Sequence, residues 1–240
     1  EVYYAAVLSN DKFLQQAFID KLDFHSYVAK QMFNLSCDVN EVKQYYANER
    51  QYAKAITFGI MYQAGPAKIA ETVNKDAAEG EEITKAQSSQ FINKYFREAR
   101  SLKKFIDQSN KQIENHAFIY SHFGRKRRLP ESKSPNKGVA SHAVRSGVNF
   151  LVQSVASDIN LLGVIDLINW IQDSGYEEDI LTFTVVHDSI VSEVREDLID
   201  IYIENARRCI QKDRGLSIPN CPIKVDFEVG SSWGELSDYK

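Results

Sequence analysis

The spacing of apolar and polar positions predicts a mostly helical chain over its first three quarters. Residues 2–34 have a helical pattern with a break near residues 20–23, and residues 39–78 contain a second long helical stretch. Residues 84–117 form one long helix or two, because large apolar side chains recur there at helical spacing. Residues 77–82 are a polar connector between these parts.

The pattern changes after residue 118 and then returns to helix. The first part of residues 119–138 favours a strand, and the end of this stretch, rich in Pro, Ser and Lys, predicts an exposed loop. Residues 139–172 are apolar on nearly all sides, which indicates a central buried helix. No uninterrupted apolar run approaches the roughly 20 residues of a membrane span, so we expect no membrane partner.

The last quarter has the pattern of antiparallel strands. Residues 180–194 are dense in β-branched side chains around a polar His-Asp-Ser, which predicts a strand, a tight turn and a strand. Residues 196–212 predict an amphipathic helix, and residues 223–230 alternate apolar and charged positions as a half-solvated strand does. The sequence therefore predicts an α+β fold with a small antiparallel sheet near its end.

Composition places the chain among ordinary globular proteins. Of its 240 residues, 43% are hydrophobic and 26% charged, and the net charge of −4 argues against a simple nucleic-acid coat protein. The cysteines, Cys37, Cys209 and Cys221, are too widely spaced for a disulfide framework or a zinc site, which indicates a reducing compartment. The sequence begins without Met inside a helical pattern, so we expect a processed chain or an excised fragment.

One helical stretch, RQYAKAITFGIMY, carries an unusual stripe of side chains. Arg50, Lys54, Phe58 and Tyr62 stand four residues apart, so they follow one slowly winding face about 18 Å long. Cations at one end and rings at the other suit a ligand with an anionic end and a flat end, such as a nucleoside triphosphate. The alternative is that both rings pack in the core and both cations are solvated.

A second candidate is Asp188 in the sequence VVHDSIV. A carboxylate at the tip of a hairpin is held rigidly and exposed, which suits a metal ligand acting on phosphate. The alternative is an ordinary turn residue, because Asp favours turns by hydrogen-bonding to its own backbone.

Two further patterns favour nucleic acid. Residues 124–137 contain six basic residues, Arg125 among them, and one acidic residue, a charge that duplex phosphate would match. Arg145, Asn149 and Gln153 step by four along one helix, and all can reach acceptors in a minor groove. A solvated loop and hydrogen bonding within the core are the respective alternatives.

The order of these motifs resembles the polymerase domain of family A DNA polymerases over essentially the whole chain. The first 35 residues look like the segment after the family's first catalytic motif, and IKVDFEVGSSWGEL looks like its C-terminus. The resemblance implies a helical fingers subdomain at residues 25–135. It implies a palm, built on a small antiparallel sheet, at residues 1–24 and 136–240.

The resemblance also implies a nucleotide site. Arg50 and Lys54 would bind the triphosphate, with Lys54 as a candidate proton donor to the leaving pyrophosphate. Phe58 would lie against the sugar and base, and Tyr62 at the template side. His25 matches a histidine that contacts the phosphates, and Glu1 matches the glutamate that blocks a ribose 2′-hydroxyl.

The remaining implied roles concern DNA and metal. Arg125, Arg145, Asn149 and Gln153 would bind the primer-template, and His187 would approach the primer terminus. Asp188 would be a catalytic metal ligand, with two Mg²⁺ ions in the complete enzyme. The expected partners are primer-template DNA and deoxynucleoside triphosphates, in the cytoplasm or, for a phage protein, the host cytoplasm, with an organelle left open.

The sequence departs from the family pattern in three places. The family's first metal-binding aspartate precedes the position of Glu1, so we expect synthesis to need an upstream polymerase segment, on this chain or another. Ser189 replaces the usual glutamate after His-Asp. Gln63 replaces a glycine that commonly follows the tyrosine.

Two other functions stay open at this point. A metal nuclease would use His187 and Asp188 with further acidic ligands nearby, for which Glu193 is the candidate. A non-catalytic fragment that binds DNA or nucleotide would keep the fold without the chemistry.

Overall fold

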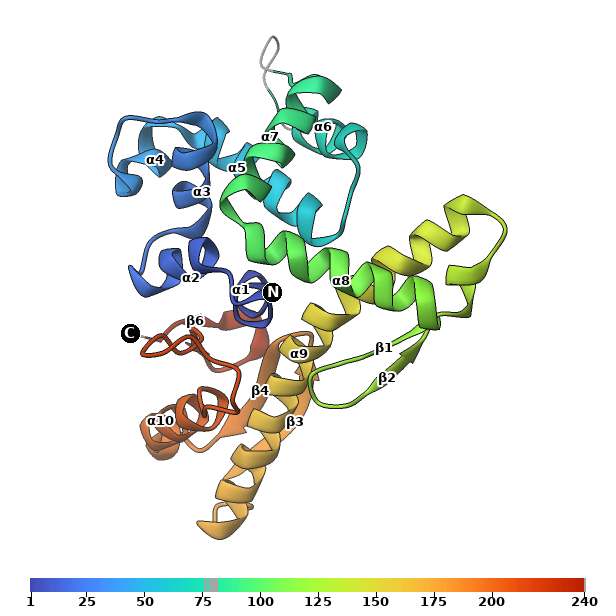
Figure 1. Cartoon of the computed structure of the whole chain (residues 1–240). Coiled ribbons are helices and arrows are strands. Elements are labelled where there is room, and N and C mark those ends of the chain that lie inside the picture. Colours follow the sequence, from blue (N-terminus) through green and yellow to red (C-terminus); the bar gives the residue numbers. More distant parts are fainter. Residues whose placement is uncertain (76, 78–81, 240) are drawn as a thin grey trace. The chain divides into compact units, whose positions relative to one another are not determined.

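The computed structural model describes residues 1–75, 77 and 82–239, and these form the predicted α+β fold (Figure 1). The helices are α1 Val2–Ser9, α2 Lys12–Ile19, α3 Phe24–Phe33, α4 Val39–Tyr45, α5 Ala47–Met61, α6 Pro66–Asn74, α7 Lys85–Glu98, α8 Arg100–His116, α9 Lys137–Asp173 and α10 Ile199–Ile210. The strands are β1 Phe118–Tyr120, β2 Lys126–Arg128, β3 Ile180–Val186, β4 Ser189–Val194, β5 Glu228–Val229 and β6 Ser237–Asp238. Short 3-10 turns cover Pro130–Lys133, Glu196–Leu198 and Trp233–Glu235.

The chain divides into two compact units. The N-terminal unit is residues 1–153 and the C-terminal unit is residues 154–240, so the division falls within α9. The resemblance implies boundaries between palm and fingers after residues 24 and 135. These boundaries do not coincide with the division after residue 153, and they stay a prediction.

Short polar side chains start several helices of the N-terminal unit. Asp11, Asp23 and Asp38 each accept a hydrogen bond from a backbone N–H in the first turn of the following helix. Thr84 caps α7 in the same way. Each cap satisfies a donor that has no partner within its own helix, which fixes where the helix begins.

The predicted helical stretches are divided more finely than the pattern indicated. Residues 2–34 contain a further break at Asn10, whose φ of 49° ends α1 in the left-handed region. Over its described residues, the stretch 39–78 consists of α4, α5 and α6. The stretch 84–117 is two helices, α7 and α8, and most of the connector 77–82 lies outside the described residues.

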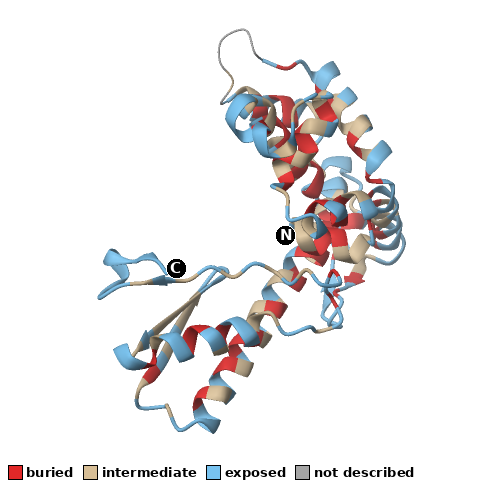
Figure 2. Ribbon diagram, turned by 90° about the vertical axis from the view of Figure 1, so that its left-hand side faces the viewer, coloured by how far each residue is buried: buried red, intermediate tan, exposed pale blue. Residues whose placement is uncertain are grey.

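One buried carboxylate links distant parts of the N-terminal unit. Asp11 is 1% exposed, and its two oxygens accept hydrogen bonds from the backbone N–H groups of Leu14, at 3.2 Å, and Leu102, at 3.0 Å. The same side chain therefore joins the first turn of α2 to the first turn of α8. The helices of the chain carry buried segments, red in Figure 2, beside exposed segments, pale blue.

Residues 126–128 of the basic segment form one strand of a hairpin, so the alternative of a solvated loop does not hold for them. β1 and β2 pair antiparallel, with Tyr120 opposite Lys126 and Ile119 opposite Arg127. The strand predicted for the first part is confirmed, but residues 126–128 are also a strand. Ile119 is 2% exposed, so its burial anchors the hairpin while the basic side chains face solvent.

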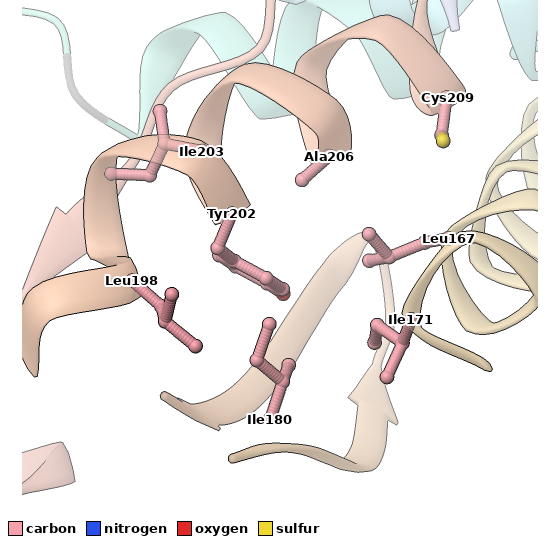
Figure 3. Close-up of a cluster of buried hydrophobic side chains, with 8 residues drawn as sticks. All are labelled: Leu167, Ile171, Ile180, Leu198, Tyr202, Ile203, Ala206 and Cys209. Carbon is pink, nitrogen blue, oxygen red and sulfur yellow. The ribbon is translucent and has the colours of Figure 1, made fainter. Parts of the chain in front are cut away.

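The core of the C-terminal unit lies between α9, β3 and α10 (Figure 3). Tyr202 of α10 reaches towards Leu167 of α9, and its hydroxyl donates to Ser192 Oγ at 2.7 Å. The predicted hairpin and amphipathic helix are confirmed by β3, β4 and α10. The buried residues of this cluster are Leu167, Ile171, Ile180, Leu198, Tyr202, Ile203, Ala206 and Cys209.

The expectation of a helix buried on all sides is wrong for part of α9. Leu161, Ile165 and Ile168 are 47%, 52% and 38% exposed, while Leu167 and Ile171 on the other face are buried. The core of this unit packs against one face of the helix only. α9 is also long and apolar enough to cross a membrane by length and composition, a test that core helices of soluble proteins pass as well.

The predicted strand at residues 223–230 is shorter than expected. Only Glu228–Val229 forms β5, which pairs with β6. The alternation of half-buried apolar and exposed charged positions nevertheless continues from Ile223 to Val229. Alternating burial thus does not require a paired backbone along the whole segment.

Gly59 permits the close approach of α5 and α6. A Cβ at this position would lie 2.5 Å from Cγ1 and 2.6 Å from Cδ1 of Ile69, which is 1% exposed. We expect Gly59→Ala to lower the free energy of unfolding by about 1–2 kcal/mol, because overpacking outweighs the gain in helix propensity. Urea unfolding measures this change.

Two further variants test the cause. Gly65→Ala is the control, because no atom of the described residues lies within 4 Å of a Cβ added there. The effect of Gly59→Ala should largely disappear in an Ile69→Ala background, where the clash is removed. An equal loss in both backgrounds would contradict the packing explanation.

Candidate functional site

The stripe on α5 faces away from the core. Tyr52, Ala53, Ile56, Thr57, Ile60 and Met61 are buried on the opposite side of this helix. Lys54 is exposed, Phe58 is half-buried and Tyr62 is 41% exposed, so the alternative that both rings are core residues is wrong for Tyr62. The pitch of the helix places these side chains in one row.

A pocket of about 360 Å³ lies between this face and α6. Lys54, Phe58 and Tyr62 line it from α5, and Ile69, Thr72 and Val73 line it from α6, together with Gln51, Ala55, Gly59 and Ala64. One end carries an ammonium group and the other carries rings. The pocket therefore offers different chemistry to the two ends of a ligand.

His25, on α3, lies beside the stripe. Its ring centroid is 5.8 Å from that of Phe58, and its Nδ1 is buried with no hydrogen-bond partner among the described residues. Burial lowers the pKa of His25 to about 4, and the positive charges of Arg50 and Lys54 act in the same direction, against the carboxylate of Asp23. A neutral imidazole with an unused nitrogen thus stands next to the cationic end of the row.

Arg50 is held by a carboxylate of α3. Its Nε donates to Asp23 Oδ1 at 2.8 Å, and its Nη2 donates to Asp23 Oδ2 at 2.9 Å. The guanidinium holds the pKa of Asp23 well below its usual range, so the pair is ionised. Arg50 is therefore not a freely solvated cation.

At the other end of the stripe, three predicted residues meet. The Tyr62 hydroxyl donates to Glu1 Oε2 at 3.2 Å, and Gln153 Nε2 donates to the Tyr62 hydroxyl at 3.3 Å. The structure thus brings together side chains from α1's N-cap, α5 and α9. The exposed positions of all three leave their polar groups accessible to a ligand.

The end of α5 is regular despite Gln63. This residue adopts φ 50°, and the N–H groups of Gln63 and Ala64 bond back to Ile60 and Gly59. Its side-chain Oε1 accepts from Asn110 Nδ2 at 3.1 Å. A hydrogen bond to α8 thus accompanies a backbone conformation that usually favours glycine.

The basic hairpin combines cations with rings. Lys126 Nζ lies 3.9 Å from the centre of the Phe118 ring, and the Arg127 guanidinium lies 5.4 Å from that of Phe150 on α9. Arg127 also donates to Ser146 Oγ at 2.8 Å. Such side chains are oriented by neighbouring rings while their charge stays at the surface.

The other residues predicted to bind DNA lie on α9 or directly before β2. Arg125 is exposed just before β2, and its guanidinium lies 5.9 Å from the centre of the Phe150 ring. Arg145 and Asn149 are half-buried on α9, and Gln153 is exposed. The idea that this polar row is satisfied only within the core does not hold for Gln153.

The hairpin of the C-terminal unit presents His187 and Asp188 at its tip. The two residues form the turn between paired Val186 and Ser189, both are exposed, and His187 has φ 56°. Nothing in the described part of the chain groups three or more His, Cys, Asp or Glu side chains as a metal site. The nuclease alternative therefore lacks its expected ligand cluster there.

Comparisons with known proteins identify the lineage. The family model for DNA polymerase family A matches residues 1–235. The chain belongs to DNA polymerase family A. This confirms the resemblance drawn from the order of the motifs.

Relatives within family A are both viral and bacterial. The chain is 49% identical over 254 aligned residues to the DNA polymerase of Escherichia phage T5, covering 100% of the chain and 30% of that protein. It is 30% identical over 236 residues to DNA polymerase I of Pseudomonas aeruginosa, covering 98% of the chain and 24% of that protein. The chain thus spans less than a third of the length of these relatives.

A solved structure shares the fold. The polymerase domain of Pol1 from M. smegmatis, in complex with DNA primer-template and dNTP, superposes with a TM-score of 0.79 at 24% identity. The match covers 93% of the chain and 36% of that protein chain. It supports the α+β fold of this family A chain.

Sequence reasoning missed part of the site. Asp23 gave a signal, since an Asp before an apolar helical pattern is an N-cap candidate, but its pairing with Arg50 joins positions 27 apart. The sequence contains no signal for the α6 residues that line the pocket, such as Thr72, because no spacing rule links α6 to α5. Both the pairing of Asp23 with Arg50 and the position of α6 depend on how the helices pack in three dimensions.

The low pKa of His25 predicts a pH dependence of stability. The unfolded chain binds a proton at His25 near pH 6.5, whereas the folded chain does so near pH 4. The free energy of unfolding should therefore fall as the pH is lowered from about 6.5 to about 4. Asp23, whose folded pKa is also depressed, should add its own loss only below about pH 3.8.

Urea unfolding at pH 7 and pH 5 measures this effect. The difference between the two should shrink in His25→Gln and stay unchanged in His122→Gln, because His122 is exposed in the β1–β2 turn. NMR titration of the His25 ring near pH 6.5 would contradict the explanation.

Proposed function

We propose that this chain is the nucleotide-gripping part of a DNA polymerase that extends a primer by template-directed synthesis. The observation that carries the proposal is the α5 row, cationic at Arg50 and Lys54 and aromatic at Phe58 and Tyr62, beside a pocket of about 360 Å³. A deoxynucleoside triphosphate has the matching polarity, with phosphates at one end and a flat base at the other. Membership of family A is consistent with that ligand.

In this proposal, residues 25–135 are fingers, and residues 1–24 and 136–240 are palm. Arg50, Lys54 and neutral His25 bind the triphosphate, and Lys54 is assigned the role of proton donor to the departing pyrophosphate. Phe58 lies against the sugar and base.

The cluster of Tyr62, Glu1 and Gln153 is assigned to the sugar and the template. Glu1 is assigned the role of blocking a ribose 2′-hydroxyl. Gln153, Asn149, Arg145 and Arg125 bind the primer-template together with the basic hairpin, mainly through phosphate charge.

Mg²⁺ is the proposed cofactor of synthesis. Asp188 is the residue we assign to it, and His187 is assigned to the primer end. The donors of the described residues do not fit two ions by themselves, because they contain no cluster of three metal-binding side chains. Bound Mg²⁺ would supply charge stabilisation to the reacting phosphate, and the proposed setting is the cytoplasm of a cell or phage host.

Nucleotide binding is the direct test. Calorimetric titration of the chain with dATP and Mg²⁺ should give an affinity that falls roughly tenfold or more in Arg50→Ala and in Lys54→Ala. Lys103→Ala is the matched control, since it removes the same charge from an exposed pair with Asp107 on α8. Equal affinities in all four proteins would contradict the assigned phosphate site.

Primer extension separates synthesis from the alternative. Extension of a labelled primer on a template, by the protein that contains this chain, supports a polymerase. Binding of dATP and DNA without extension supports a non-catalytic binding fragment.

Phe58 predicts discrimination against dideoxynucleotides. A Phe ring offers no hydroxyl to stand in for the missing 3′-hydroxyl of a chain terminator, whereas a Tyr ring would. Phe58→Tyr should therefore raise dideoxynucleotide incorporation relative to dATP by roughly tenfold or more in competitive primer extension. Phe91→Tyr, a half-buried ring on α7, is the control, and an unchanged ratio in Phe58→Tyr would refute the assignment of the sugar to Phe58.

A further inference from the structure

The ion pair between Asp23 and Arg50 suggests a role beyond the proposed nucleotide contacts. We propose that Asp23 is a positioning residue, which holds the Arg50 guanidinium so that its remaining N–H groups face the triphosphate. This inference rests on the proposed function, because it assigns a second residue to the same phosphate end of the site.

The geometry of the pair leaves donors unused. A guanidinium has five N–H groups, and the pair uses the Nε–H and one Nη2–H, at 2.8 Å and 2.9 Å. The other three N–H groups, on Nη1 and Nη2, have no partner in the described part of the chain. They form the free edge of a planar fork, which is the group that phosphate oxygens bind in pairs.

Asp23 is itself fixed in place. It caps α3, and the oxygen that receives Arg50 Nε also accepts the backbone N–H of Ser26 at 2.8 Å. α3 in turn packs against α5, and both helices contribute fully buried side chains to the unit's core, Val28 from α3 and Ile56 from α5. A rigid carboxylate therefore restricts the rotation of the long Arg50 side chain before any ligand arrives, which lowers the entropy lost on binding.

The surroundings indicate a phosphate end rather than a structural ion pair alone. His25, two residues after Asp23, is neutral at physiological pH and has an unused, buried Nδ1. Lys54 lies one helical turn beyond Arg50 and faces the pocket. The pair is also only partly buried, with 23% of the Arg50 side chain and 42% of the Asp23 side chain exposed.

A competing role for Asp23 predicts the opposite change in nucleotide affinity when its charge is removed. If Asp23 occupied Arg50 and excluded the nucleotide, removing its charge would tighten binding. If it orients Arg50, removing its charge weakens binding, because a free guanidinium has to be ordered by the ligand. The sign of the effect distinguishes the two.

The experiment is calorimetric titration of the chain with dATP and, separately, with inorganic tripolyphosphate. Asp23→Asn removes the charge but retains an N-cap, since Asn caps helices as well as Asp does. We expect roughly tenfold weaker binding of both ligands. Asp38→Asn is the matched control, because Asp38 also caps a helix, α4, and forms no ion pair with an arginine among the described residues.

Arg50 variants test the coupling. The loss caused by Asp23→Asn should vanish in an Arg50→Ala background. Arg50→Lys should weaken binding about as much as Asp23→Asn, because an ammonium keeps the charge but lacks the fork. This second variant keeps the positioning role open to refutation even where Asp23→Asn does not fold, because full affinity in Arg50→Lys would overturn it.

The outcomes are distinct. Unchanged or tighter binding in Asp23→Asn, or an equal loss in the Arg50→Ala background, would overturn the positioning role while leaving the nucleotide site in place. Full affinity in Arg50→Lys would overturn it as well. No binding by the unaltered chain, or full affinity in Arg50→Ala, would instead remove the assigned phosphate site, and the inference with it.

Discussion

The pitch of α5 is the constraint on which the candidate site depends. A four-residue step advances a helix by about 400°, so residues 50, 54, 58 and 62 remain on one face over about 18 Å. The intervening apolar residues of α5 are buried, which fixes the rotation of the helix about its axis. Helix geometry thus places charge at one end of the row and rings at the other, and packing against α3 and α6 supplies the rest of the candidate site.

Neighbouring charges and hydrogen bonds determine how the side chains of the α5 row are held. The Asp23 side chain both caps α3 and accepts hydrogen bonds from Arg50, so one carboxylate connects the start of α3 to the cationic end of the α5 row. Burial keeps His25 neutral beside two cations, which leaves its imidazole compatible with their charge. At the opposite end, the cluster of Tyr62, Glu1 and Gln153 ties α5 to α9 through hydrogen bonds of a few tenths of an ångström beyond the ideal length.

The sequence predicted what depends on periodicity and short motifs. The α5 row, the His187-Asp188 hairpin and α10 follow from spacing, β-branched residues and amphipathic pattern, and the structure confirms those elements. The strand at Lys126–Arg128 was missed because three consecutive basic residues have no apolar alternation, and its backbone is fixed by pairing with β1. The exposed side of α9 was not predicted, because an apolar sequence does not show which other elements cover each face of the helix. The pairing of Asp23 with Arg50 was missed for a related reason, since it depends on how α3 packs against α5.

The most direct measurement is a crystal structure of the chain with a bound, non-hydrolysable dATP analogue. We expect phosphate oxygens within hydrogen-bond distance of Arg50 and Lys54, and the sugar and base against the Phe58 ring. A nucleotide bound in the reverse orientation, or away from α5, would contradict it.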